Sequence, residues 1–87
     1  MPGRRVTIVN ELGLHARAAA KFVKLAARFS AAIKVARDGQ QVSGSSILGL
    51  MMLAAAPGDE IEISAEGDDA DRAIAELCEL VAAGFGE

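Results

Sequence analysis

Apolar and polar residues alternate in four short stretches of the chain, and this two-residue period predicts four β-strands. The clearest stretch is Glu60–Ser64, in which Ile61 and Ile63 share one face. Because each stretch is apolar on one face only, the pattern is typical of an antiparallel sheet that helices cover on one side. The other three predicted strands are Arg5–Ile8, Ile33–Ala36 and Gln40–Ser43, the last two joined by a turn at Asp38-Gly39.

Three helices are predicted between and after these strands. The first runs from Ala16 to about Phe29, and the second is a short apolar helix over Ile47–Leu53 that Ser45 or Ser46 can cap. The third follows Asp68 or Asp69 as its cap, and its buried stripe has the i, i+3, i+4, i+7 spacing of Ile74, Leu77, Cys78 and Val81. The predicted fold is therefore α+β, in the order βαββαβα, with three helices on one face of a four-stranded antiparallel sheet.

Composition narrows the class of protein. Eighty-seven residues are enough for one domain, residues 1–87, and too few for two cores. A net charge of −3 and 3% aromatic residues argue against a nucleic-acid-binding protein. The most apolar run, 47–57, is shorter than the ~20 residues of a membrane span. One cysteine and one histidine predict no disulfide within the chain, no metal site and no cofactor. We expect a cytoplasmic monomer with no membrane insertion.

The single histidine, His15, lies where the first strand signal ends and the first helix signal begins. Gly13 permits an unusual backbone just before it, and Ala16 leaves space beside it. A helix start offers unpaired N–H groups that suit an anion. The imidazole can therefore accept a phosphoryl group while the backbone N–H groups of Ala16 and Arg17 and the Arg17 guanidinium hold its oxygens. The alternative is a capping histidine in a surface loop.

The first predicted helix carries a basic stripe and no acidic residue. Its members follow i, i+4, i+7, i+11 spacing and are Arg17, Lys21, Lys24 and Arg28. Beside His15 in an acidic protein, this stripe predicts a docking surface for acidic partners. The alternative is an ordinary solvated helix face.

The short second helix is apolar nearly all round, so part of it is expected to be exposed. The residues predicted to dock partners are Ile47, Leu48 and Met51, with Met52 beside them. The alternative is simple core packing. Ser46 is predicted to be the N-cap, and a phosphate there would meet the helix start favourably at the rim of this apolar surface. Cys78, on a buried stripe, is expected to be structural.

Taken together, these residues resemble the HPr family, the histidine phosphocarriers of the phosphoenolpyruvate-dependent phosphotransferase system. The resemblance implies an open-faced β-sandwich, in agreement with the element order above. The chain departs from many members at Ala18, where they carry proline, and at Ser45, where they carry a basic residue. The pieces that carry the resemblance are Asn10-x-x-Gly13-Leu14-His15-Ala16-Arg17, Ala20-x-Phe22-Val23, Val42-x-x-x-Ser46-Ile47-x-Gly49-Leu50-Met51 and Gly58-Asp59-x-Ile61.

The resemblance also implies a function. His15 would accept a phosphoryl group at Nδ1 from phosphorylated enzyme I and pass it to an enzyme IIA-type domain, with Arg17 holding the phosphate. Ser46 matches the serine that an HPr kinase/phosphorylase modifies in some bacteria. Such a protein is a carrier and not a stand-alone enzyme. The alternative is a purely regulatory binding module switched at Ser46. The Ala-rich first helix is more similar to the nitrogen-related regulatory branch than to the sugar-uptake branch.

Overall fold

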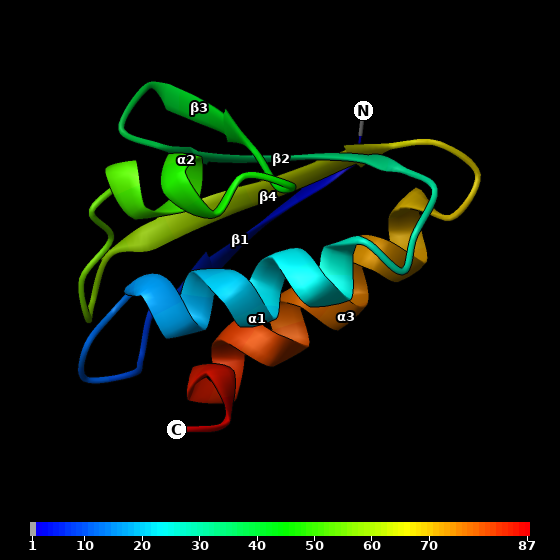
Figure 1. Cartoon of the computed structure of the whole chain (residues 1–87). Coiled ribbons are helices and arrows are strands. Elements are labelled where there is room, and N and C mark those ends of the chain that lie inside the picture. The colour runs from blue at the N-terminus through cyan, green and yellow to red at the C-terminus, as the bar shows by residue number, and fades with distance from the viewer. Residues whose placement is uncertain (1) are drawn as a thin grey trace.

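Four strands and three helices follow one another in the order that the apolar pattern predicts (Figure 1). The computed structural model describes residues 2–87. A short turn with a left-handed backbone, η1 (Gly84–Gly86), follows α3. The other elements are β1 (Gly3–Thr7), α1 (Ala16–Ala26), β2 (Ala32–Arg37), β3 (Gln40–Ser43), α2 (Ile47–Met52), β4 (Glu60–Glu66) and α3 (Ala70–Ala82).

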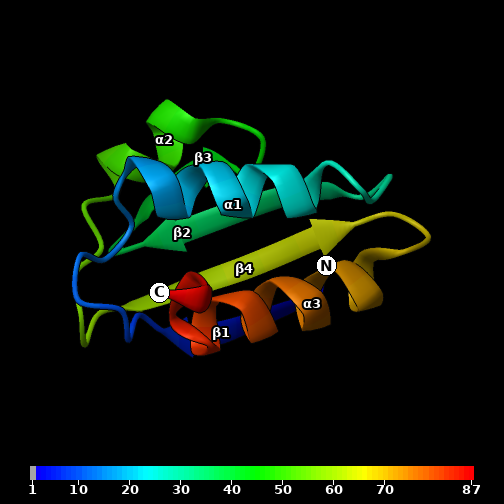
Figure 2. The ribbon, with the colours of Figure 1, turned by 60° about the horizontal axis from the view of Figure 1, so that its bottom comes forward.

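The strands form one antiparallel sheet in the order β1-β4-β2-β3. In its register Val35 of β2 lies opposite Ile63 of β4, and both side chains are buried. Ile61 is buried on the same face, as the alternation predicts. The three helices cover this face, and the other face is open (Figure 2). The predicted α+β class and the one-sided arrangement of the helices are confirmed.

The two long helices form because each presents one apolar face to the sheet. In α3 the predicted stripe of Ile74, Leu77, Cys78 and Val81 is buried throughout. Burial raises the pKa of the Cys78 thiol, so this group stays protonated and packs as an apolar side chain. Helix α1 ends at Ala26 and not near Phe29, because the N–H groups of Arg28 and Phe29 bond three residues back and tighten the chain into a turn.

The two predicted helix caps have different outcomes. Ser46 caps α2 as expected, because its hydroxyl oxygen accepts the Gly49 N–H at 2.9 Å. Asp69 occupies the N-cap position of α3, but its side chain makes no cap hydrogen bond, so the expectation for this residue was wrong. Its two carboxylate oxygens accept the backbone N–H groups of Ser30 and Ala31, each at 2.9 Å. Asp69 therefore ties the start of α3 to the loop before β2.

The loop between β1 and α1 is fixed by the segment that follows α2. The Leu14 N–H donates to the Ala55 carbonyl oxygen at 3.0 Å. Gly13 has φ of 64°, and a Cβ atom built on it would lie 2.3 Å from that same oxygen. Only glycine fits this approach, which places His15 at the end of α1 that lies beside α2 (Figure 1). No helix within residues 2–87 has the length and apolarity to cross a membrane.

Candidate functional site

His15 occupies the N-cap position of α1. Its backbone is extended, with φ −78° and ψ 177°, and its carbonyl oxygen accepts the Ala19 N–H at 2.9 Å. The imidazole makes no capping hydrogen bond. Across residues 2–87, the N–H groups of Ala16, Arg17 and Ala18 in the first turn have no acceptor. Ala16 and Arg17 are exposed, so their N–H groups lie where an anion at the helix start can reach them, whereas Ala18, in the third helical position, is buried.

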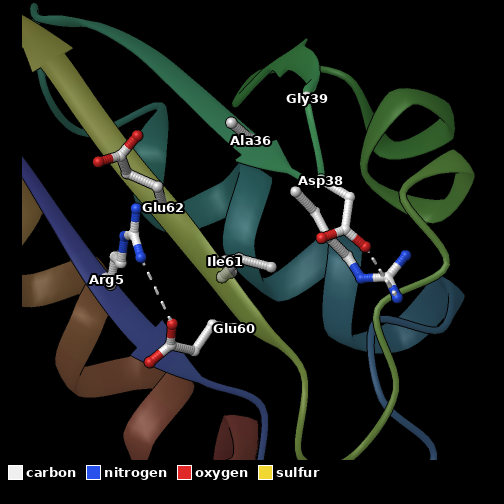
Figure 3. Close-up of a pocket in the computed structure, with 8 residues that line it drawn as sticks. Arg5, Ala36, Asp38, Gly39, Glu60, Ile61 and Glu62 are labelled. Atoms are coloured by element: carbon white, nitrogen blue, oxygen red, sulfur yellow. Dashed lines mark ion pairs between the residues drawn. The ribbon is translucent and has the colours of Figure 1, made fainter.

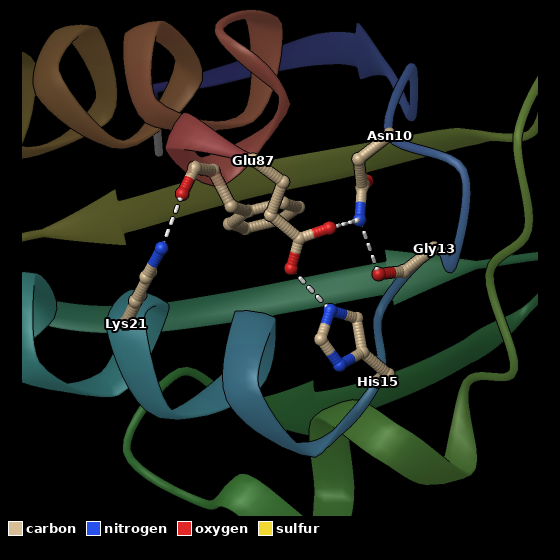
Figure 4. Close-up of polar contacts among 6 residues, drawn as sticks. Asn10, Gly13, His15, Lys21 and Glu87 are labelled. Carbon is tan, nitrogen blue, oxygen red and sulfur yellow. Dashed lines mark hydrogen bonds and ion pairs between the residues drawn. The ribbon is translucent and has the colours of Figure 1, made fainter.

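The imidazole has one partner, and it comes from the other end of the chain. The Nε2 atom of His15 contacts a carboxylate oxygen of Glu87, and the two side chains are 24% and 22% exposed (Figure 4). Sequence reasoning missed Glu87, because 72 residues separate it from His15. In Figure 4 the other ring nitrogen of His15 is turned away from the carboxylate.

Asn10 holds the Glu87 carboxylate in place. Its side-chain amide donates to the Gly13 carbonyl oxygen at 2.8 Å and to the second Glu87 oxygen at 3.1 Å. The Asn10 side chain is buried, and its own Oδ1 atom has no partner in the described chain. The Asn10 hydrogen bond, with the His15 contact adding to it, lowers the pKa of Glu87 below its usual range. The carboxylate is thus ionised at neutral pH.

A tight turn brings Glu87 to this position. Gly84, Phe85 and Gly86 all have left-handed backbones, with φ of 65°, 56° and 75°. The Phe85 ring is buried, and its carbonyl oxygen accepts a hydrogen bond of 2.7 Å from Lys21 Nζ. The Gly-Phe-Gly sequence is a turn signal that could have pointed to this reversal, although it does not indicate where the turn packs.

The cations of the basic stripe of α1 differ in whether they have a hydrogen-bond partner. Lys21 is engaged by the last turn of the chain, as described above. Arg17 and Lys24 are exposed and have no ion pair or hydrogen bond with any side chain or carbonyl of residues 2–87. The structure places Arg17 two residues from His15 in the first turn, and the one hydrogen-bond and ion-pair partner of the His15 side chain within residues 2–87 is Glu87. Its guanidinium is available to an incoming anion.

Helix α2 presents the exposed apolar surface that its sequence predicts. Leu48 and Met52 are 68% and 62% exposed, and Ile47 and Met51 are 41% and 40% exposed. Leu50 and Leu53 take the opposite face and are fully buried. Helix α2 packs against α1 and lies beside the end of α1 at which His15 is the N-cap residue (Figure 2).

The open face of the sheet carries a separate hollow, shown in Figure 3. Two ion pairs lie in it: Arg5 lies 3.9 Å from Glu60, and Arg37 lies 3.6 Å from Asp38. The Arg37 side chain also donates to the Leu53 carbonyl oxygen at 2.9 Å and pairs with Asp59 at 3.0 Å. This hollow holds no histidine, cysteine or serine. No group of three metal-ligating side chains occurs in the part of the chain that the structure describes.

Fold and site together define a small α+β protein that presents one histidine at a helix start, beside an exposed apolar surface. Residues 3–83 match the family model described as the PTS HPr component phosphorylation site. The chain is 46% identical to the phosphocarrier protein HPr of Cupriavidus necator and to the phosphocarrier protein NPr of Shewanella violacea. Each alignment spans 84 residues, which are 97% of this chain and 94% and 92% of the relatives.

Solved structures agree with these relatives. The crystal structure of HPr from Thermoanaerobacter tengcongensis matches with a TM-score of 0.95 and 44% identity, covering 100% of this chain and 98% of that one. A second crystal structure from that organism, of an HPr dimer, matches with a TM-score of 0.79 over the whole of both chains. The chain therefore belongs to the HPr family, the phosphocarrier proteins of the phosphotransferase system.

Proposed function

We propose that this phosphocarrier accepts a phosphoryl group on His15 Nδ1 from phosphorylated enzyme I and passes it to an enzyme IIA-type domain. The observation that carries the proposal is the position of His15 at the N-cap of α1, followed by three N–H groups without acceptors. On acceptance the bond between phosphorus and the enzyme I donor breaks as the Nδ1–phosphorus bond forms. On delivery the Nδ1–phosphorus bond breaks as the bond between phosphorus and the acceptor forms. The oxygens of the bound phosphoryl group face the backbone N–H groups of Ala16 and Arg17 and the Arg17 guanidinium.

We propose further that both partners dock on the side of the molecule that carries the histidine. The apolar part of this surface is Ile47, Leu48 and Met51, and the charged part is Arg17 and Lys24, with Lys21 at its edge. An acidic partner would be steered by the charges and held by the apolar contacts. A carrier that meets two partners through one surface must release each quickly, which a small and partly charged surface allows. We expect the chain to act in this way as a cytoplasmic monomer without a cofactor.

Ser46 supports a second, regulatory proposal. Its hydroxyl oxygen caps α2 at the rim of the apolar surface, and the residue is half-buried. A phosphate on Ser46 would be favoured by the start of α2 and would place negative charge where an acidic partner docks. We propose that an HPr kinase/phosphorylase modifies this serine and weakens partner docking. A chain that is phosphorylated only here would be a regulatory module and not a carrier.

Intact-mass spectrometry tests the proposal directly. The protein is incubated with phosphoenolpyruvate and its cognate enzyme I, alongside the folded His15→Ala variant. We expect the mass of one phosphoryl group to be gained, lost in acid, stable in mild base and absent from His15→Ala. A gain that appears only with a nucleotide and a serine kinase, survives acid and persists in His15→Ala would support the Ser46 alternative. No gain on the folded wild-type protein would contradict the carrier function.

A further inference from the structure

The Glu87 carboxylate contacts the candidate phosphoryl acceptor, and nothing in the motif around His15 requires it. We propose that Glu87 is a positioning residue that holds the His15 ring with its proton on Nε2 and so leaves Nδ1 as the nucleophile. This inference rests on the proposed function, because it assigns a role within the same site. It concerns how the ring is prepared and not whether it is phosphorylated.

The hydrogen-bonding capacity of the two groups carries the first step. An ionised carboxylate can only accept hydrogen bonds, so the Nε2 atom of His15 that contacts it must carry a proton. A neutral imidazole has one N–H and one lone pair, and the lone pair is then on Nδ1. The pKa of Glu87 is lowered by its hydrogen bond from Asn10 and by the His15 contact, which keeps the carboxylate in the accepting form.

The surroundings of Glu87 show that the contact is built and not incidental. One of its oxygens accepts from the buried amide of Asn10, and the other faces Nε2, so both are occupied (Figure 4). The preceding turn is anchored by the buried Phe85 ring and by the Lys21 hydrogen bond to the Phe85 carbonyl oxygen. A free surface side chain has none of these restraints. Exposed ion pairs between unrestrained side chains rarely hold one geometry, whereas these restraints hold the Glu87 carboxylate against His15.

The arrangement has a consequence for the transfer step. When Nδ1 attacks phosphorus and the donor bond breaks, the ring gains positive charge that is shared with Nε2–H. The Glu87 carboxylate faces this charge, as carboxylates face histidines in catalytic triads and in metal sites. The proton remains on Nε2 throughout, so no base is needed. Return of the phosphoryl group to an acceptor regenerates the same neutral ring and the same contact.

The experiment compares wild-type protein with Glu87→Ala and Glu87→Gln, and Glu79→Ala of α3 is the control for loss of an exposed acidic side chain. The ¹⁵N shifts of the two His15 ring nitrogens are recorded at a pH where the ring is neutral, and the rate of phosphoryl acceptance is measured from the same samples. We expect a dominant Nε2–H form in wild type and in Glu79→Ala. In Glu87→Ala the two forms mix and the acceptance rate falls about tenfold.

Glu87→Gln separates the two effects of the carboxylate. Its amide oxygen can still accept from Nε2–H, so the ring form is retained, but the negative charge is absent and the rate falls. Unchanged ring shifts or an unchanged acceptance rate in Glu87→Ala would overturn the inference, whatever the wild type does as a carrier. A wild-type protein that is not phosphorylated on His15 would overturn the proposed function, and the ring shifts would still decide whether Glu87 positions the histidine.

Discussion

The ammonium group of Lys21 donates a hydrogen bond of 2.7 Å to the backbone carbonyl oxygen of Phe85, 64 residues further along the chain. The bond joins the middle of α1 to the turn that carries Glu87. Lys24, almost one helical turn further on, is exposed and contacts no acceptor of residues 2–87. Two lysines that look equivalent in the basic stripe therefore have different surroundings, one structural and one open to a partner.

The first prediction compares these two lysines. Lys21→Met keeps the length of the side chain but removes the donor, and we expect it to lower the free energy of unfolding by about 1 kcal/mol. Hydrogen exchange at the Gly86 and Glu87 N–H groups should become faster in the same variant. Lys24→Met is the matched control and should change neither quantity. Equal urea midpoints for the two variants would show that the Phe85 contact contributes nothing to stability.

The fold could be predicted because its elements leave local signals in the sequence. The alternation at Ile61 and Ile63, and the spacing of Ile74, Leu77 and Val81, report burial on one face directly. The last residue of α1 was harder to predict. A helix of alanines and lysines has no local signal that ends it at Ala26 and not three residues later. The role of Asp69 was also hidden, because its partners lie in a loop 38 and 39 residues earlier.

The residues of the candidate site also fall into those that the sequence predicts and one that it does not. His15, Arg17, Ser46 and the apolar face of α2 follow from short-range pattern and helix position. Glu87 could not be found by such reasoning, because its approach depends on three consecutive left-handed residues and on the packing of Phe85. Long-range polar contacts of this kind depend on tertiary structure, which no local pattern encodes.

The second prediction concerns Gly13→Ala. The added Cβ would lie 2.3 Å from the Ala55 carbonyl oxygen, so the loop must move and take the start of α1 with it. We expect a loss of roughly 2–3 kcal/mol in the free energy of unfolding, measured by urea denaturation, and a displaced His15 resonance.

Gly58→Ala is the control for backbone strain alone. Gly58 also has a positive φ, of 92°, but an added Cβ would meet no atom within 4 Å. Its cost should therefore be about 1 kcal/mol, without an effect on His15. If the two variants were equally destabilised, the contact with the Ala55 oxygen would not be what requires glycine at position 13.

The third prediction addresses the apolar surface of α2. Met51→Glu would place a charge where the proposed partners bury apolar side chains, and it would oppose an acidic partner. We expect about a tenfold rise in the enzyme I concentration that half-saturates phosphoryl transfer, with the fold unchanged. Ala75→Glu adds the same charge on the exposed side of α3 and should leave this concentration near that of the wild type. If both variants half-saturated at the same enzyme I concentration, α2 would not be part of the docking surface.

The fourth prediction is a pH dependence that Asp69 confers. Hydrogen bonds from the Ser30 and Ala31 N–H groups lower the pKa of Asp69 below its usual range, with the Ser30 bond the larger cause. A carboxyl group whose pKa is lower in the folded than in the unfolded protein stabilises the fold above its unfolded pKa. That stabilisation is lost as the pH falls through the lower, folded pKa, because the protonated group accepts the two N–H groups poorly.

Urea denaturation at a series of pH values tests this contribution. Asp69→Asn should be less stable than wild type at neutral pH, and the difference should shrink as the pH falls below about 4, because wild type then loses the same charge. Asp68→Asn is the matched control, since Asp68 is exposed and accepts no hydrogen bond from residues 2–87. It should follow the wild-type curve closely. The difference in the free energy of unfolding between Asp69→Asn and wild type could instead stay constant down to acid pH. The shape of the Asp69 side chain, and not its charge, would then hold the loop before β2.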